Sequence, residues 1–161
     1  MSFFYSTHAV KKHTVLPAGT TRETALAALH NHGLLISLNP LVISFGPISG
    51  PKDSPPATRH YEIEDRVYLM PGKLWPSEVK YTAEFTDEED GVRVVTHAPM
   101  GFEGRTKWSV EEAEGSFAIV EDAILRCPVP LMPFIKATSK SSHDKMHVSL
   151  SEKIEKGEVK Y

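Results

Sequence analysis

The sequence predicts an α+β fold in which a curved antiparallel sheet of six to seven strands wraps around one long C-terminal helix. The order of the elements supports this prediction. Residues 7–16 read as extended, residues 21–32 as a short helix rich in Ala and Leu, and residues 131–156 as a long helix. About six strand patterns follow one another between Leu41 and Cys127. This order leaves room between sheet and final helix, so we expect a ligand cavity there.

The composition is that of a single globular domain, which we expect to span residues 1–161. A chain of this length buries roughly two-thirds of its unfolded surface, and 40% of its residues are hydrophobic. The net charge of −3 argues against a nucleic-acid partner. The single cysteine, Cys127, excludes an internal disulfide and is typical of a reducing compartment. With no apolar run long enough to span a membrane and no secretory signal, we expect a cytoplasmic monomer or homodimer.

The first strand and helix have clear boundary signals. Pro17-Ala18-Gly19 ends the strand as a turn. Thr20 or Thr21 can cap the helix, and Glu23 places an acid in its first turn, where the helix dipole favours one. Gly33 is expected as its C-cap, and a second short turn over residues 34–38 leads to Asn39-Pro40.

The strands are predicted from period-two alternation. In the clearest example, Ile63, Asp65 and Val67 share one face and Glu62, Glu64 and Arg66 the other. The acidic run at residues 87–91 is expected as a solvated hairpin tip. The six candidates are residues 41–48, 60–69, 78–86, 92–100, 105–110 and 117–127.

The broad face of the final helix is only half apolar. Thr138, Ser142 and Ser149 occupy positions where a helix on a dry core usually carries Leu or Ile. Small polar residues there favour a helix that lines a partly wet cavity.

Several segments carry a resemblance to a known superfamily. The chain resembles the helix-grip (START/Bet v 1-like, SRPBCC) superfamily, which includes lipid-transfer domains, birch-pollen allergens and aromatic polyketide cyclases, and more narrowly a fungal family of small proteins of unknown function. The resemblance implies a pocket for a lipid, sterol, hormone or polyketide, and in some members a ring closure. It rests on the N-terminal residues 1–8, Ala28–His32, Asn39-Pro40, Tyr61–Asp65, Trp75, Phe85–Gly91, Trp108–Val110 and Val120–Asp122.

Two carboxylates lie among apolar residues on different strands. A carboxylate on a cavity wall has a raised pKa and can act as a general acid or base, which makes Asp65 and Glu121 catalytic candidates. Two other interpretations stay open: Glu121 faces solvent beside Asp122, or Asp65 pairs with an arginine inside the fold.

Histidines supply further candidates. His97, in mid-strand, and His143, on the final helix, can each shuttle protons near neutral pH. His143 and His147 also have the i, i+4 spacing of a helical metal pair, but no third ligand of matched spacing is visible. We therefore interpret them as a surface pair and expect no metal. His30 and His32 are explained by the negative end of the first helix.

Aromatic and small polar residues are the candidates for ligand contact. They can stack on a polyene or ring system, although for any single aromatic residue a place in the core is the better interpretation. The predicted ligand-binding set is Tyr61, Trp75, Tyr81, Phe102, Trp108, Phe134, Thr138, Ser142 and Met146.

No motif for a nucleophile, a phosphate loop or a cofactor is found in the chain. We therefore expect a cofactor-free cyclase that holds a hydrophobic small molecule in a reactive fold, either Diels-Alderase-like or polyketide-cyclase-like, in fungal natural-product biosynthesis. The alternative is a non-catalytic carrier of a lipid, sterol or terpenoid. A weaker third interpretation is an interaction module whose pocket is closed by side chains.

Overall fold

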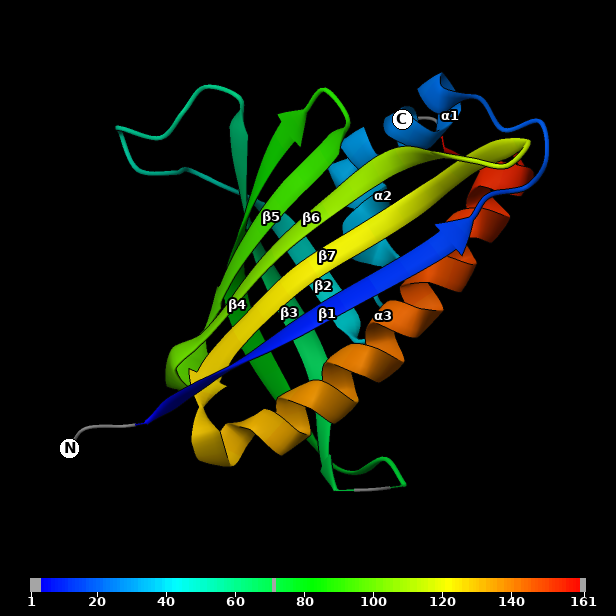
Figure 1. Ribbon diagram of the computed structural model, residues 1–161. Coiled ribbons are helices and arrows are strands. Elements are labelled where there is room, and N and C mark those ends of the chain that lie inside the picture. Colours follow the sequence, from blue (N-terminus) through cyan, green and yellow to red (C-terminus); the bar gives the residue numbers. More distant parts are fainter. Residues whose placement is uncertain (1–3, 71, 160–161) are drawn as a thin grey trace.

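In the computed structural model, which describes residues 4–70 and 72–159, seven antiparallel strands form one sheet in the order β1-β7-β6-β5-β4-β3-β2 (Figure 1). The first strand and the six that follow the helices are all present, so the predicted fold class is confirmed. The elements are β1 (Tyr5–Val15), α1 (Arg22–His30), α2 (His32–Ser37), β2 (Val42–Ile48), β3 (Thr58–Met70), β4 (Leu74–Glu88), β5 (Gly91–Ala98), η1 (Pro99–Gly101), β6 (Phe102–Ala113), β7 (Ser116–Pro128), η2 (Val129–Leu131) and α3 (Met132–Glu155), where η denotes a single 3₁₀ turn.

The helix expected over residues 21–32 is divided in two by Asn31. The amide of Asn31 donates to Ala27, which ends α1, and its side-chain oxygen accepts from the amide of Leu34 at 3.0 Å, which caps α2. The predicted cap at Thr21 is confirmed, because its hydroxyl oxygen accepts from the amide of Thr24 at 3.1 Å. A single Asn thus serves as the C-cap of one helix and the N-cap of the next.

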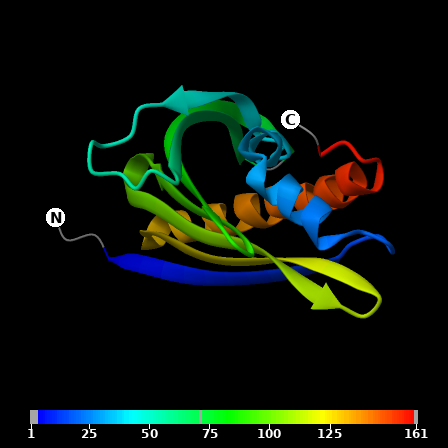
Figure 2. The ribbon, with the colours of Figure 1, turned by 90° about the horizontal axis from the view of Figure 1, so that it is seen from above.

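The sheet curves around α3, which runs along its inner face beside β1 and β7, while α1 and α2 cover one end (Figure 2). The register places Lys12 of β1 opposite Glu121 of β7, and Glu121 opposite Trp108 of β6. Residues that are direct partners share a face of a sheet. Lys12, Glu121 and Trp108 therefore all point toward α3.

A cluster of buried apolar residues packs α1 and the second half of α3 against the sheet. Leu29 of α1, Ile119 of β7 and Leu150 of α3 are almost fully buried there, each stabilising the fold by about 2–3 kcal/mol. At the start of β5, Gly91 lies so close to the Trp108 backbone that any Cβ would overlap it. Toward the first half of α3, inner-face residues such as Thr96 and Thr106 remain partly accessible.

Among the described residues, no helix has both the length and the apolar character needed to cross a bilayer.

Candidate functional site

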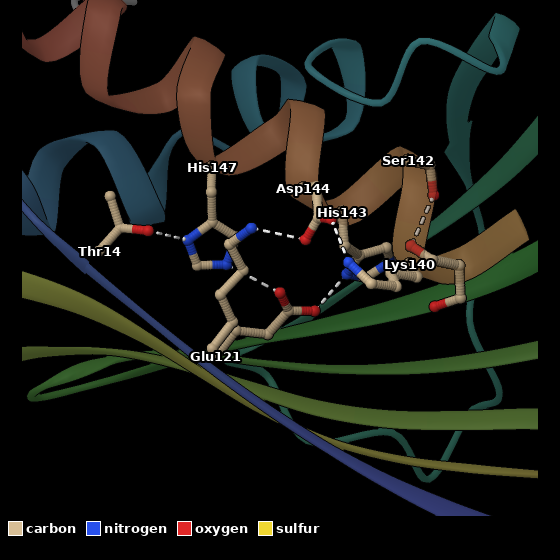
Figure 3. A network of polar contacts seen from close by, with 9 residues as sticks. Thr14, Glu121, Lys140, Ser142, His143, Asp144 and His147 are labelled. Atoms are coloured by element: carbon tan, nitrogen blue, oxygen red, sulfur yellow. Dashed lines mark hydrogen bonds and ion pairs between the residues drawn. The ribbon is translucent and has the colours of Figure 1, made fainter. Parts of the chain in front are cut away.

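A buried carboxylate joins two histidines between β7 and α3. Glu121 is 1% exposed and points from β7 toward α3 (Figure 3). Its Oε2 lies 2.8 Å from Nε2 of His147, and its Oε1 contacts Nδ1 of His143. The i, i+4 spacing puts both imidazoles on one face of α3, so a single carboxylate reaches both rings.

The hydrogen bonds of His147 are completed by Thr14 of β1. The Thr14 hydroxyl lies 2.8 Å from Nδ1 of His147. When this hydroxyl donates to Nδ1, the Nε2–H of His147 donates to Glu121, and the ring is neutral with both nitrogens satisfied. His147 is 2% exposed, so this neutral form avoids burying an additional charge.

Glu121 is held as the carboxylate. Burial alone would raise its pKa, but the hydrogen bonds from His143 and His147 outweigh burial and lower the pKa to about 2. The group is therefore ionised at neutral pH. In this state it accepts a hydrogen bond from an N–H of each histidine.

Trp108 forms the floor beneath both imidazoles. Its ring centroid lies 4.9 Å from that of His147 with a 30° interplanar angle, and 6.1 Å from that of His143 with a 20° angle. Trp108 is 3% exposed, so its own position is fixed by packing. The stacking limits rotation of both rings and keeps their nitrogens directed at Glu121.

Two lysines fix the outer side of this region. Lys12 lies 2.5 Å from Asp144 and Lys140 lies 2.7 Å from it, and these hydrogen bonds lower the pKa of Asp144 to about 2. Such exposed pairs contribute at most about 1 kcal/mol each. Their effect is to hold α3 against β1 next to His143.

Asp65 and Tyr81 form a second polar pair on the inner faces of β3 and β4. The Tyr81 hydroxyl donates to Asp65 at 3.2 Å. Burial raises the pKa of Asp65 to about 6, although this hydrogen bond opposes the rise. Burial, together with the adjacent Asp65 charge, also raises the pKa of Tyr81. Between about pH 4 and pH 6, Asp65 therefore keeps a proton that an exposed Asp would have lost.

Several expectations about these residues are corrected by the structure. Glu121 does not face solvent, and Asp65 bonds Tyr81 rather than an arginine. The interpretation of His143 and His147 as a surface pair is wrong, because both contact Glu121. Glu121 could not be predicted as their common partner, because it lies on a strand and the spacing of residues along the helix gives no signal for it.

His97 and Trp75 lie away from the interior. The register pairs His97 with Glu103 on the outer face of β5 and β6, where the imidazole is half exposed. Inner-face positions of β5 are Val92, Val94 and Thr96, one residue out of phase with His97. Trp75 is 68% exposed in the turn between β3 and β4.

The remaining predicted ligand-contact residues are distributed over the inner surface. The Tyr61 hydroxyl lies 3.0 Å from His32, in a separate cluster in which His32 also contacts Asp87 at 2.8 Å. This role of His32 was not predicted from the sequence. Ser142 is buried and donates to the Ser139 carbonyl at 3.2 Å, and Met146 belongs to the core. Phe102, Phe134 and Thr138 are partly accessible.

Two open hollows lie on the outer face of the sheet. One is lined by residues of β2, β3 and β4, including Glu62 and Glu64, and the other by residues of β3 and β4, including Tyr68 and Glu78. Neither contains a predicted ligand-contact residue. In the part of the chain that the structure describes, no group of three or more His, Cys, Asp and Glu side chains is arranged to hold a metal ion.

The chain was compared with known families and structures. Residues 5–156 match the model of a family described as "Domain of unknown function (DUF7053)". Curated proteins give no match. Similar solved structures include TTHA0849 from Thermus thermophilus, with a TM-score of 0.63 and 12% identity over 94% of this chain and 99% of that one. The Zhui aromatase/cyclase from a Streptomyces species has a TM-score of 0.61 and 8% identity over 94% and 96%. Ara h 8.0201 has a TM-score of 0.57 and 14% identity over 90% and 98%. At these identities the similarity establishes the fold, which is the predicted helix-grip fold, while the resemblance to a fungal family stays a prediction.

Proposed function

The chain belongs to the family described as "Domain of unknown function (DUF7053)", and from its fold and its site we propose that it binds one hydrophobic small molecule between the sheet and α3 and closes a ring in it without a cofactor. The observation that carries this proposal is the ionised Glu121 hydrogen-bonded to His143 above the Trp108 ring. The setting we propose is natural-product biosynthesis, as the helix-grip resemblance implies.

The binding surface would be the inner face beside the first half of α3. Phe102 of β6 and Phe134 and Thr138 of α3 remain partly accessible there. Aromatic rings with a few polar groups are typical of pockets for hydrophobic ligands. The interior beside α1 is filled by almost fully buried side chains such as Leu29 and Ile119, whereas Phe102, Phe134 and Thr138 are partly accessible, which supports placing the ligand here rather than beside α1.

His143 would act as the general base. Its Nδ1–H donates to Glu121, which leaves the lone pair of Nε2 free to accept a proton, and within the described residues Nε2 has no hydrogen-bond partner. The carboxylate would stabilise the imidazolium that forms. His147, Thr14 and Trp108 would be positioning residues, since they hold Glu121 and the rings in place.

Asp65 and Tyr81 would supply the acid. The Tyr81 hydroxyl, whose pKa is raised, keeps its proton and can donate a hydrogen bond to a substrate carbonyl, and Asp65 can do so when it is protonated. The base would remove a proton from the carbon next to that carbonyl, and the resulting enolate carbon would attack a second carbonyl of the same molecule. One carbon–carbon bond forms, and the proton from His143 returns to the new alkoxide.

A carrier function is the second candidate. Among the described residues, every buried side-chain nitrogen and oxygen has a hydrogen-bond partner. A fully satisfied network is also what a purely structural role requires. The same ligand surface would then serve transport.

The test begins with native mass spectrometry of the protein purified from its own host, followed by identification of any bound compound. Ring closure of that compound or its open-chain precursor is then measured with His143→Asn, which keeps a donor to Glu121 but removes the base. The matched control is His97→Asn on the outer face. We expect about a hundredfold or greater loss of turnover for His143→Asn, with binding retained and the control unchanged. Binding without any rate above background in the wild type would support the carrier instead.

A further inference from the structure

Exposed apolar side chains gather at one end of the sheet. Antiparallel pairing places the β3–β4 turn, the β5–β6 turn and the end of β7 at the same end, the lower end in Figure 1. Leu69, Met70, Leu74 and Trp75 flank or form the first turn, and each is about half exposed or more. Met100 in η1 is 71% exposed, and Val129 in η2 is 48% exposed. Burying these side chains in the fold would be the ordinary outcome, so their exposure points to a partner.

Three residues in these two turns have a left-handed backbone conformation. The described residues other than glycine with positive φ are Lys73 at 57°, Trp75 at 57° and Met100 at 62°. All three lie in the two apolar turns. Such conformations are uncommon for bulky residues and persist only where the surrounding structure enforces them. The fold thus maintains strained turns that present large apolar groups to solvent.

The two ends of the sheet also differ in charge. The opposite end carries two acidic hairpin tips, formed by Asp87–Asp90 between β4 and β5 and by Glu111, Glu112 and Glu114 around the β6–β7 turn. At the apolar end, Glu78 and Glu103 are paired with Arg66 and Arg105. Apart from Asp65, which is buried, the other charges there are basic: Lys73 in the turn, Arg126 near the end of β7 and Lys136 near the start of α3.

We propose that this end docks on an anionic lipid bilayer, with the β3–β4 turn inserted into the interface. Tryptophan favours the membrane interface, leucine and methionine favour the acyl region, and lysine favours the lipid phosphates. With this end on the bilayer, the acidic hairpin tips face away from the negative lipid surface. The difference in charge between the two ends therefore determines how the protein is oriented on the bilayer. Separate protruding tips fit a fluid partner, whereas a rigid protein would need a matching recess for each tip. This proposal rests on the surface alone and does not depend on the proposed ring closure.

Tryptophan fluorescence gives a direct test, because the two tryptophans differ in exposure. Trp75 is 68% exposed and Trp108 is 3% exposed, so a change on adding vesicles reports the turn. We expect vesicles of phosphatidylcholine mixed with phosphatidylserine to shift the emission to shorter wavelength and to co-sediment the protein. Pure phosphatidylcholine vesicles and added salt are expected to weaken both effects.

Variants distinguish the contribution of apolar insertion to vesicle binding from that of positive charge. The double variant Leu74→Ser with Trp75→Ser is expected to weaken vesicle binding at least about tenfold. Lys73→Glu is expected to weaken it about fivefold or more on phosphatidylserine vesicles. The matched control is Val148→Ser, an exposed apolar position on α3 that is expected to bind as the wild type does. Thermal unfolding verifies that each variant is folded.

Three outcomes would overturn the proposal. The first is a wild type that binds neither kind of vesicle, and the second is a double variant that binds as tightly as the wild type. The third is a wild-type dimer, measured by light scattering, that the double variant abolishes while vesicle binding is absent. This last result would assign the apolar end to a second copy of the chain.

Discussion

Replacing Glu121 by Gln tests whether the buried carboxylate stabilises the fold through its two histidines. The folded pKa of about 2, compared with the ordinary 4.5, corresponds to about 3 kcal/mol of stabilisation at neutral pH. Gln removes the charge and also places its amide N–H against one imidazole N–H, which leaves a buried donor unsatisfied. We therefore expect Glu121→Gln to lower the free energy of unfolding by about 3 kcal/mol, or the melting temperature by about 6–12 °C.

The pH dependence of this loss distinguishes the charge from packing. Because the folded pKa is lowered, the stabilisation is fully present above about pH 4.5 and is lost as the pH falls toward 2. Gln does not titrate, so the difference between wild type and variant should shrink across that range. A packing defect would give a difference that is independent of pH.

The assay is thermal and urea unfolding of both proteins from pH 7 down to the lowest pH at which the wild type is folded. Glu111→Gln, an exposed position on β6, is the control and should change the free energy of unfolding by no more than about 0.5 kcal/mol. A loss below about 1 kcal/mol for Glu121→Gln, or a loss that stays constant with pH, would refute the reasoning.

Two further predictions concern the second polar pair and the sheet. Asp65→Asn should stabilise the protein by about 2 kcal/mol at pH 7, because the raised pKa of Asp65 means that its ionisation costs stability as the pH rises from 3.8 through 6. Urea unfolding at pH 7 and pH 4 measures this, and a variant less stable than the wild type at pH 7 would contradict it. Gly91→Ala should destabilise by at least about 2 kcal/mol, since its Cβ would overlap the Trp108 carbonyl and displace β5 from β6. Gly46→Ala, where a Cβ meets nothing within 4 Å, is the control, and equal melting temperatures for the two variants would refute the argument.

The strands were predictable because apolar residues of an inner face recur at every second position of the strand's own sequence. Ile63 and Val67 flank Asp65 at a period of two, and this placed Asp65 inward correctly. The same signal is weak in β5, where Thr96, His97 and Ala98 give no clear alternation, so the outward position of His97 could not be assigned. The exposed position of Trp75 could not be predicted, because an apolar residue beside a Pro-Gly turn is equally consistent with a pocket wall and an exposed tip.

The site is built from residues that are close in the sequence and from residues that are far apart in it, and only the former could be predicted to lie together. The spacing of His143 and His147 is local and correctly places both on one helix face. Thr14 lies 133 residues from His147 along the chain, and nothing near either residue indicates that they meet. Only the sheet order, with β1 beside β7, brings them together.

The pairing of β1 with β7 has a consequence for how the protein is made. During synthesis β1 emerges first, yet its partner strand emerges only after five other strands, so β1 stays unpaired through most of translation. An unpaired strand is a template for association with other chains, and charged residues, lysine above all, counter that tendency. The pair Lys11-Lys12, which lies near the centre of β1 and is followed by His13, supplies this protection. Lys12 then forms its ion pair with Asp144 once α3 is complete. The same residue therefore opposes association of the unpaired strand during synthesis and holds β1 against α3 in the folded protein.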